Sequence, residues 1–306
     1  MLAFLLACTG PSDAPPADTA APVDTAEAVG DSGGPFAVAF RYVVIADPHV
    51  SDPTGENLDR LDAAVAWINA EAGARDLRLV LVVGDIAWGD GMDAARASLD
   101  RLAIPYVPLN GDNEVHLGSE EAYALAFADV YDTLATTFDA WTMGPVAVDH
   151  PEYGPAWLHN LAFSYEGVRF VGLDWASRSP STVLSELGEL HDFEGGTFPF
   201  FEAEVGAAGG ELEDVVLFGH MPMHLGVFDL EQMARIAGVT APHGDHVWAD
   251  LAGHFHANGS QRVEDGGYDV YVTDATWDDD VELRIVEVQA NRARFAPTTD
   301  TVVVPY

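Results

Sequence analysis

Short apolar runs and helical patterns alternate along the chain after residue 40. Strands are predicted at 41–47, 77–85 and 104–112, and helices between them at 56–74 and 92–102. In the first helix Gly73 marks the end, and one face carries the apolar residues Leu58, Leu61, Val65 and Ile68. This β-α-β-α-β order predicts a mostly parallel sheet in the first half of an α/β protein.

The second half of the chain is richer in predicted strands. A long helical pattern at 120–141 is followed by a Gly- and Pro-rich insertion, 142–160, for which the pattern predicts no clear structure. Strands are then predicted at 162–174, 213–220, 246–256, 268–275 and 281–288. We interpret residues 36–306 as one α/β domain with two packed sheets and outer helices.

The N-terminal segment has a different composition. Residues 1–8 are mostly apolar and end in Cys8, and the four residues before Thr9 (LLAC) resemble a bacterial lipobox, whose cysteine carries lipid. Residues 9–35 are mainly Pro, Ala, Asp, Thr and Ser, a composition typical of a disordered tether. This order predicts a lipoprotein signal peptide and an envelope protein anchored on Cys8, facing the periplasm or the exterior. The alternative is an unprocessed start with an incidental cysteine, because the apolar stretch is short and lacks Lys or Arg.

The charge is strongly negative. Asp and Glu number 50 against 13 basic residues, all of them Arg, and the net charge is −37. Such a field repels polyanions, so no nucleic-acid partner is expected. An anionic substrate must therefore be attracted by a local cationic centre.

Polar residues with metal-binding chemistry stand at the ends of five predicted strands. The segments are Asp47-Pro48-His49, Gly84-Asp85, Gly111-Asp112-Asn113-Glu114, Gly219-His220 and Gly253-His254-Phe255-His256. Side chains at i and i+2 of an extended segment point the same way, and carboxyl ends of parallel strands are where sites form. Each segment alone is a weak signal, but the set predicts a cluster of carboxylates and imidazoles.

In this order the five segments resemble the calcineurin-like metallophosphoesterase superfamily over about residues 41–290. The resemblance implies a four-layer α-β-β-α sandwich of two mixed sheets flanked by helices. It also implies two transition-metal ions, Fe, Mn or Zn, which hydrolyse a small phosphoester with a metal-bridging hydroxide. By the family pattern one ion is held by Asp47, His49, Asp85 and His256, and the other by Asp85, Asp112, His220 and His254.

The third segment departs from the family pattern G-N-H-[D/E]. Asp112 stands where the pattern has a neutral Asn ligand, and Asn113 where it has a His that assists the phosphate or leaving group. A third ligand carboxylate leaves a net charge of about +1 on two divalent ions, which favours monoanionic diesters over dianionic monoesters. A shifted register, with Asn113 as ligand, is the alternative.

Three other side chains are candidates for work on the substrate. With no histidine at 113, His116 and His224 are candidate general acids, and the alternative for each is an ordinary loop histidine. Arg178 is the candidate phosphate-binding residue, and Asp174 is expected to brace the site. Trp88 is expected to pack beside the metals, and the alternative is a platform for the substrate. We expect the other five histidines to be solvated: His150, His159, His191, His243 and His246.

Two functions of different classes remain open from the sequence. The first is a metal-dependent phosphoesterase, and the second is a surface lipoprotein of the same fold that binds metal or phosphate without turnover. The departure from the family pattern at Asp112 and Asn113 is the feature that favours the second function. All seven family ligand positions nevertheless carry nitrogen or oxygen donors, which favours the enzyme.

Overall fold

The computed structural model describes residues 34–179, 187–211, 213–278, 280–291 and 295–306. The predicted signal peptide, Cys8 and the tether up to residue 33 lie outside these ranges. In the described part, none of the helices has the length and apolar character that a membrane span requires.

The first sheet has five strands within the described ranges, in the order β14-β13-β1-β2-β3. β1, β2 and β3 pair in parallel, and β13 and β14 extend the sheet antiparallel to β1. The strands are β1 (Ala37–Ile45), β2 (Leu77–Val83), β3 (Tyr106–Leu109), β13 (Val281–Ala290) and β14 (Phe295–Val304).

The second sheet has the described order β11-β12-β10-β9-β8-β7-β4. Its middle is parallel from β8 through β9 and β10 to β12, and the remaining pairs are antiparallel. The strands are β4 (Asp139–Met143), β7 (Leu161–Tyr165), β8 (Val168–Leu173), β9 (Asp214–Gly219), β10 (Val247–Ala252), β11 (Gly259–Val263) and β12 (Tyr268–Val272). A separate hairpin joins β5 (Ala147–His150) to β6 (Gly154–Trp157).

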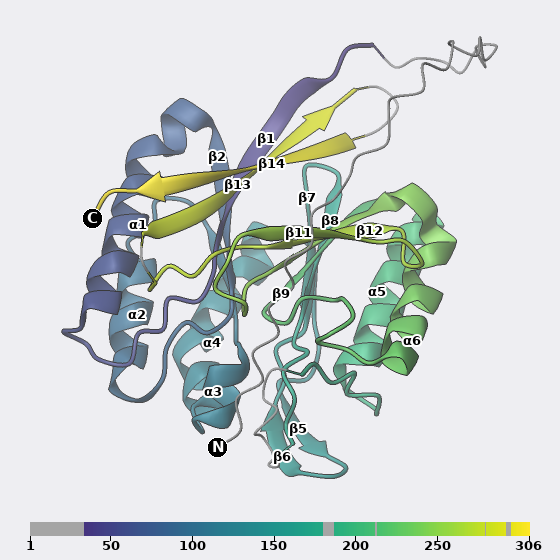
Figure 1. Cartoon of the computed structure of the whole chain (residues 1–306), viewed down its shortest axis with the longest axis horizontal. Helices are drawn as coiled ribbons and strands as arrows, with labels where there is room; N and C mark the ends of the chain where they lie inside the picture. The colour runs from purple at the N-terminus through teal and green to yellow at the C-terminus, as the bar shows by residue number, and fades with distance from the viewer. Residues whose placement is uncertain (1–33, 180–186, 212, 279, 292–294) are drawn as a thin grey trace, which may run out of the picture.

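Helices flank the two sheets (Figure 1). Their bounds are α1 (Glu56–Arg75), α2 (Met92–Leu99), α3 (Asp112–His116), α4 (Glu120–Thr137), α5 (Thr197–Glu211) and α6 (Leu230–Thr240), with 3₁₀ turns η1 (Gly89–Gly91) and η2 (Ala241–His246). α1 and α2 lie on the side of the first sheet, and α5 and α6 lie on the side of the second. The predicted four-layer sandwich is confirmed.

Two apolar cores hold these layers together. The larger core fills the space between the sheets, where Tyr42 of β1 meets Phe170 of β8 edge to face with ring centres 5.3 Å apart. It continues under α1 through the predicted apolar stripe, in which Leu61, Val65 and Ile68 are buried. The second core lies between the second sheet and α5 and α6. Rigid sheets packed in this way bring the carboxyl ends of β1, β2, β3, β9 and β10 to one region.

The structure corrects several predicted elements. The insertion 142–160 contains the β5–β6 hairpin, whose four-residue strands are too short to show alternation. The helix predicted to 141 ends at Thr137, and 139–143 is strand β4. The single strand predicted at 162–174 is the hairpin β7–β8, which reverses at Glu166-Gly167 with both residues in the left-handed region. Strands β11 and β14, which carry many exposed polar residues, were not predicted.

Candidate metal centre

The seven predicted metal ligands come together at the strand ends. Asp47 and His49 follow β1, Asp85 follows β2, and Asp112 follows β3 at the start of α3. His220 follows β9 of the other sheet, and His254 and His256 follow β10. They form three overlapping groups with donor atoms within 4.8 Å of one another: Asp47-His49-His256, Asp47-Asp85-His220 and Asp112-His220-His254.

The first predicted ligand set is centred on Asp47, which is fully buried. Its Oδ1 lies 3.7 Å from His49 Nε2 and 3.4 Å from His256 Nε2. His49 Nε2 is also 3.1 Å from Asp85 Oδ2. Two donors bound to one transition ion at 2.0–2.2 Å are separated by about 3.3 Å in tetrahedral geometry, so these spacings suit a shared cation.

The second predicted set surrounds Asp112. Its Oδ1 lies 2.8 Å from His220 Nε2 and 3.5 Å from His254 Nδ1. Asp85 Oδ1 is 3.5 Å from the same His220 nitrogen, so Asp85 faces both sets with its two oxygens. His220 Nδ1 donates to the carbonyl of Val83 at 3.1 Å, which leaves Nε2 as the ligand atom.

The buried charges of the cluster call for cations. Burial alone would lower the pKa of His49, but Asp47 and Asp85 raise it to about 9. Burial opposes the charge of His220 too, yet Asp85 and Asp112 raise its pKa well above the usual value. Three buried carboxylates in mutual reach repel one another, and positive charge offsets that cost. The donor set of three carboxylates and four imidazoles therefore fits two transition-metal ions.

Five of the seven side chains stand on backbone in the left-handed region. The φ angles are 49° at Asp47, 51° at His49, 50° at Asp85, 75° at His254 and 49° at His256. This conformation is unfavourable for residues other than glycine and persists where the surrounding fold enforces it. The ligands therefore stand on backbone that differs from the extended conformation expected from the sequence.

Glycines leave the space that the ligands occupy. A Cβ at Gly111 would lie 2.1 Å from Asp85 Oδ1, and one at Gly253 would lie 2.3 Å from Asp47 Oδ2. Both distances are far shorter than real contacts, so only glycine permits these carboxylates in their places.

Asn113 and Glu114 support the ligand Asp85 and its loop. The backbone N–H of Asn113 donates to Asp85 Oδ1 at 2.9 Å, and its side-chain amide donates to Asp85 Oδ2. Glu114 is fully buried and accepts the N–H groups of Ala87 and Gly111, each at 2.7 Å. Burial, together with Asp85, raises the pKa of Glu114 to about 8. The structure therefore agrees with the first of the two registers, because Asp112 lies beside His220 and His254 and Asn113 is hydrogen-bonded to Asp85.

The two candidate general acids lie at the edges of the cluster. His116 ends α3 and is partly buried, and its Nε2 has no hydrogen-bond partner among the described residues. Burial lowers its pKa, partly offset by Asp112. The ring of His224 lies 5.5 Å from Phe255, which stands between the ligands His254 and His256. Both rings thus lie beside residues of the cluster, His116 four residues after Asp112 in α3 and His224 against Phe255.

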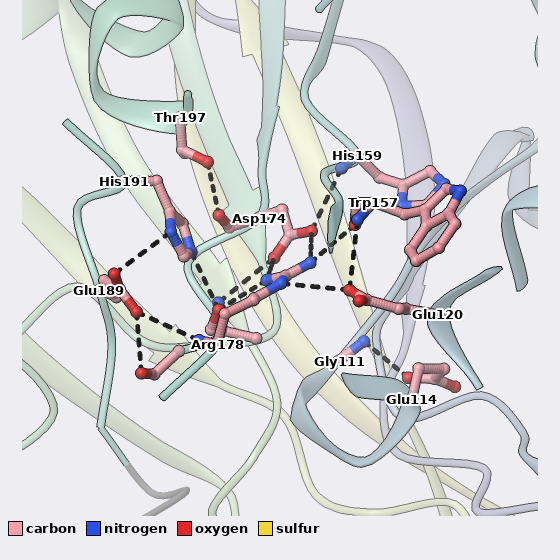
Figure 2. A network of polar contacts seen from close by, with 12 residues as sticks. Gly111, Glu114, Glu120, Trp157, His159, Asp174, Arg178, Glu189, His191 and Thr197 are labelled. Atoms are coloured by element: carbon pink, nitrogen blue, oxygen red, sulfur yellow. Dashed lines mark hydrogen bonds and ion pairs between the residues drawn. The ribbon is translucent and has the colours of Figure 1, made fainter. Parts of the chain in front are cut away.

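Arg178 occupies a structural position and not an open one. Its side chain is buried and pairs with both oxygens of Asp174, at 2.6 and 2.8 Å, and with Glu120 at 3.2 Å (Figure 2). The carbonyls of Ala176 and Trp157 take its remaining N–H groups. All five donors are thus engaged, and the predicted phosphate-binding role gives way to a structural one. Asp174 braces this network, accepting also the N–H of His159.

Three histidines expected in solvent are buried, and that expectation was wrong. His150, His159 and His191 are 4%, 0% and 2% exposed, because the segments 144–160 and 187–196 fold over the end of the second sheet. Burial lowers the pKa of His159 and of His191 to about 4, so both are neutral at pH 7.

Two indoles enclose His49. Trp88 meets it edge-on, with ring centres 5.1 Å apart, as expected for a packing residue. Trp277 stacks on it at 5.2 Å with an interplanar angle of 18°. Sequence reasoning missed Trp277, because it lies in a loop without periodicity, far from His49 along the chain.

The sheets and the clustered donors define an α/β protein with a candidate metal centre where strand ends meet. The sequence pattern of the calcineurin-like phosphoesterase family matches residues 40–271, and the chain belongs to that family. Together with the ligand clusters, this membership supports a metal-dependent phosphoester hydrolase at the level of the family. No curated protein matches the chain in sequence.

Solved structures with a similar fold include the sulfate thiohydrolase SoxB of Thermus thermophilus in complex with glycerol. It has 16% identity and a TM-score of 0.50 over 89% of this chain, which spans 57% of the SoxB chain. Two structures of vacuolar protein sorting 29 also match over 87% of this chain and 100% of theirs. The Cryptosporidium parvum protein has 8% identity and a TM-score of 0.33. A double mutant of the Entamoeba histolytica protein has 12% identity and a TM-score of 0.26.

Proposed function

We propose that the chain hydrolyses phosphoesters at a dinuclear metal centre, whose two ions would be held by the seven clustered donors with Asp85 between them. The observation that carries the proposal is the position of Asp85 between two clusters, Asp47-His49-His256 and Asp112-His220-His254. Its oxygens face His49 on one side and His220 on the other. Two such ions, when bound, supply a nucleophile at neutral pH and stabilise the charge that develops on the phosphoryl group.

The protein's own side chains set the charge and geometry of this centre. Asp112 contributes a carboxylate beside His220 and His254. Asn113 holds Asp85 in place from its backbone and its side chain. Because three carboxylates leave only about +1 on two divalent ions, a monoanionic phosphodiester is the preferred substrate class over a dianionic monoester.

The test compares two chromogenic esters with the purified full chain, after chelation and reloading with Mn²⁺ or Zn²⁺. We expect bis-p-nitrophenyl phosphate to be hydrolysed faster than p-nitrophenyl phosphate. The variant His256→Asn is expected to lose turnover, whereas His243→Asn, a histidine outside the cluster, is expected to keep it. Metal-loaded protein that binds phosphate but hydrolyses neither ester would favour the non-catalytic binding protein instead.

The Asp112→Asn variant examines the substrate preference separately. Removing one carboxylate raises the charge of the centre by one unit. With about 5 Å between charges and an effective dielectric constant of 20–80, the gain for a dianion over a monoanion is about 1–3 kcal/mol. The monoester-to-diester ratio of kcat/KM is therefore expected to rise about 5- to 150-fold. An unchanged ratio in an active variant contradicts the charge argument.

We also infer that the protein is held at the bacterial cell envelope by lipid on Cys8. The support is the lipobox-like LLAC segment followed by a polar tether. Expression of Cys8→Ala in a bacterial host is expected to move the protein from the membrane fraction to the soluble fraction. Equal membrane association of both forms would contradict the anchor.

A further inference from the structure

A second histidine cluster lies outside the seven-ligand centre and shares no residue with it. His150 ends β5, and Glu189 and His191 lie in the segment that precedes α5. One donor atom of each comes within 4.8 Å of the others. Figure 2 shows Glu189 and His191 at one end of the network around Arg178.

Glu189 presents one oxygen to both imidazoles. Its Oε1 lies 3.1 Å from His150 Nε2 and 3.6 Å from His191 Nδ1. Its Oε2 is fixed from behind, by the Ser177 hydroxyl at 2.9 Å and the Arg178 N–H at 3.1 Å. A tetrahedral zinc site separates its donors by about 3.3 Å, so both spacings fit.

His191 points an unpartnered nitrogen into this cluster. Its ring is buried, and Nε2 donates to the carbonyl of Ala176 at 2.9 Å. The neutral ring therefore carries its lone pair on Nδ1, which has no hydrogen-bond partner in the part of the chain that the structure describes. A histidine that donates one N–H to a backbone carbonyl and offers the other nitrogen is arranged as metal-binding histidines are.

The surroundings favour a cation and give it access. Arg178 carries one positive charge, against the negative charges of Asp174, Glu120 and Glu189. The cluster opens on a cavity of about 300 Å³, whose lining includes the acidic residues Glu152, Asp192, Asp229 and Glu231 and one basic residue, Arg235, which pairs with Asp192. The cavity has room for the water that completes a site with three protein ligands.

We propose that His150, Glu189 and His191 bind one zinc ion, with solvent from this cavity in the fourth position. Two imidazoles and a carboxylate are a ligand set that zinc favours. The ion links the β5–β6 hairpin to the segment 187–196, in which Glu189 accepts the backbone N–H of Arg178. It therefore also stabilises the hydrogen-bond network around Arg178.

Binding changes the tautomer of His150. In the ion-free arrangement its Nδ1 accepts the N–H of Glu152 at 3.2 Å, so Nε2 carries the proton. Zinc on Nε2 requires that proton on Nδ1, with no net release. The N–H of Glu152 then turns to water, which is available because Glu152 is exposed.

The test counts zinc per chain in the full-length protein, by plasma mass spectrometry after reloading and removal of weakly held ions with a mild chelator. We expect His150→Gln and His191→Gln each to hold one zinc fewer than wild type, and His243→Gln the same number. The difference of one stands whether or not the seven-ligand centre is loaded, so the two proposals fail independently. Equal zinc in wild type and both cluster variants overturns the site.

A measurement on the unaltered protein covers the event that the variants do not fold, which circular dichroism will reveal. Crystals of the zinc-loaded wild type, measured on both sides of the zinc absorption edge, are expected to show an anomalous peak among the three side chains. Full loading with no peak there, and Glu189 still hydrogen-bonded to His150, overturns the proposal.

Discussion

Replacing Gly253 with alanine gives a narrow perturbation of the candidate metal centre. The new methyl group would lie 2.3 Å from Asp47 Oδ2 and 3.1 Å from the Cβ of Ala46. Gly253 does not stand in the left-handed region, so an alanine backbone is permitted there. The strain therefore falls on the carboxylate of Asp47, which also accepts the N–H of His254 at 3.0 Å.

The size of the displacement follows from contact distances. A Cβ essentially never comes within 3.0 Å of another heavy atom, so the Asp47 oxygen must move by about 0.7 Å or more. Ligand distances at a metal are fixed to about 0.2 Å, and a misplacement of about 1 Å costs about 10²-fold in rate. We expect G253A to lose about 10²-fold in kcat/KM and 10- to 100-fold in metal affinity.

The assay measures metal content, diester hydrolysis and urea unfolding for G253A beside Gly73→Ala. Gly73 lies in α1, and a Cβ there meets nothing within 4 Å. That control is expected to keep its activity and gain about 0.5–1 kcal/mol of stability from helix propensity. G253A with wild-type metal content and activity would refute the role given to Asp47 and to the space beside it.

Three further predictions concern stability. Asp250 is buried, and burial raises its pKa to about 7, so the wild type loses stability between about pH 4 and 7 as the unfolded chain releases this proton first. In urea unfolding, the free energy of unfolding of Asp250→Asn is expected to exceed that of wild type by up to about 4 kcal/mol at pH 8 and by much less at pH 4. An equal difference at both pH values contradicts this. Arg178→Met leaves Asp174 buried without its partner and is expected to lower the free energy of unfolding by about 3–5 kcal/mol. Arg262→Met, which breaks an exposed pair, is expected to lower it by less than about 1 kcal/mol. Similar losses in the two variants would show that the buried network contributes little. Chelation is expected to lower Tm by about 5–10 °C, because one ion at 100 times its Kd stabilises the folded state by about 2.7 kcal/mol. Adding Mn²⁺ or Zn²⁺ is expected to restore the Tm. A Tm that does not change with chelator contradicts metal binding to the folded state.

The fold and the ligand cluster could be predicted because their signals are local. Apolar runs of strand length ended in Asp or His, and helical patterns separated them, so strand order and strand ends were both visible. A glycine directly before a ligand was a further local signal in the sequence. The structure explains it at Gly111 and Gly253, where a Cβ would overlap a ligand carboxylate. The left-handed backbone at the ligands was not visible, because tertiary packing imposes it against local preference.

The rest depended on contacts between distant segments. Arg178 was expected to meet phosphate, but Glu120, 58 residues earlier in the chain, pairs with it together with Asp174. His159 and His191 lie in loop-like segments and were therefore expected in solvent, and only the folded arrangement shows that they are buried. Burial of a loop histidine is a property of its neighbours in space and leaves no periodic pattern in the sequence.

The charge of the whole protein and the reduced charge of the proposed centre both favour a monoanionic ester over a dianionic one. A net charge of −37 repels a dianion more strongly than a monoanion, and the nearby guanidinium of Arg178 is neutralised by Asp174 and Glu120. Attraction of an anionic ester therefore falls to the metal ions, whose charge Asp47, Asp85 and Asp112 reduce. An ester with one negative charge and two organic groups loses less to the global field and needs less from the centre, which is the physical basis for proposing diesters.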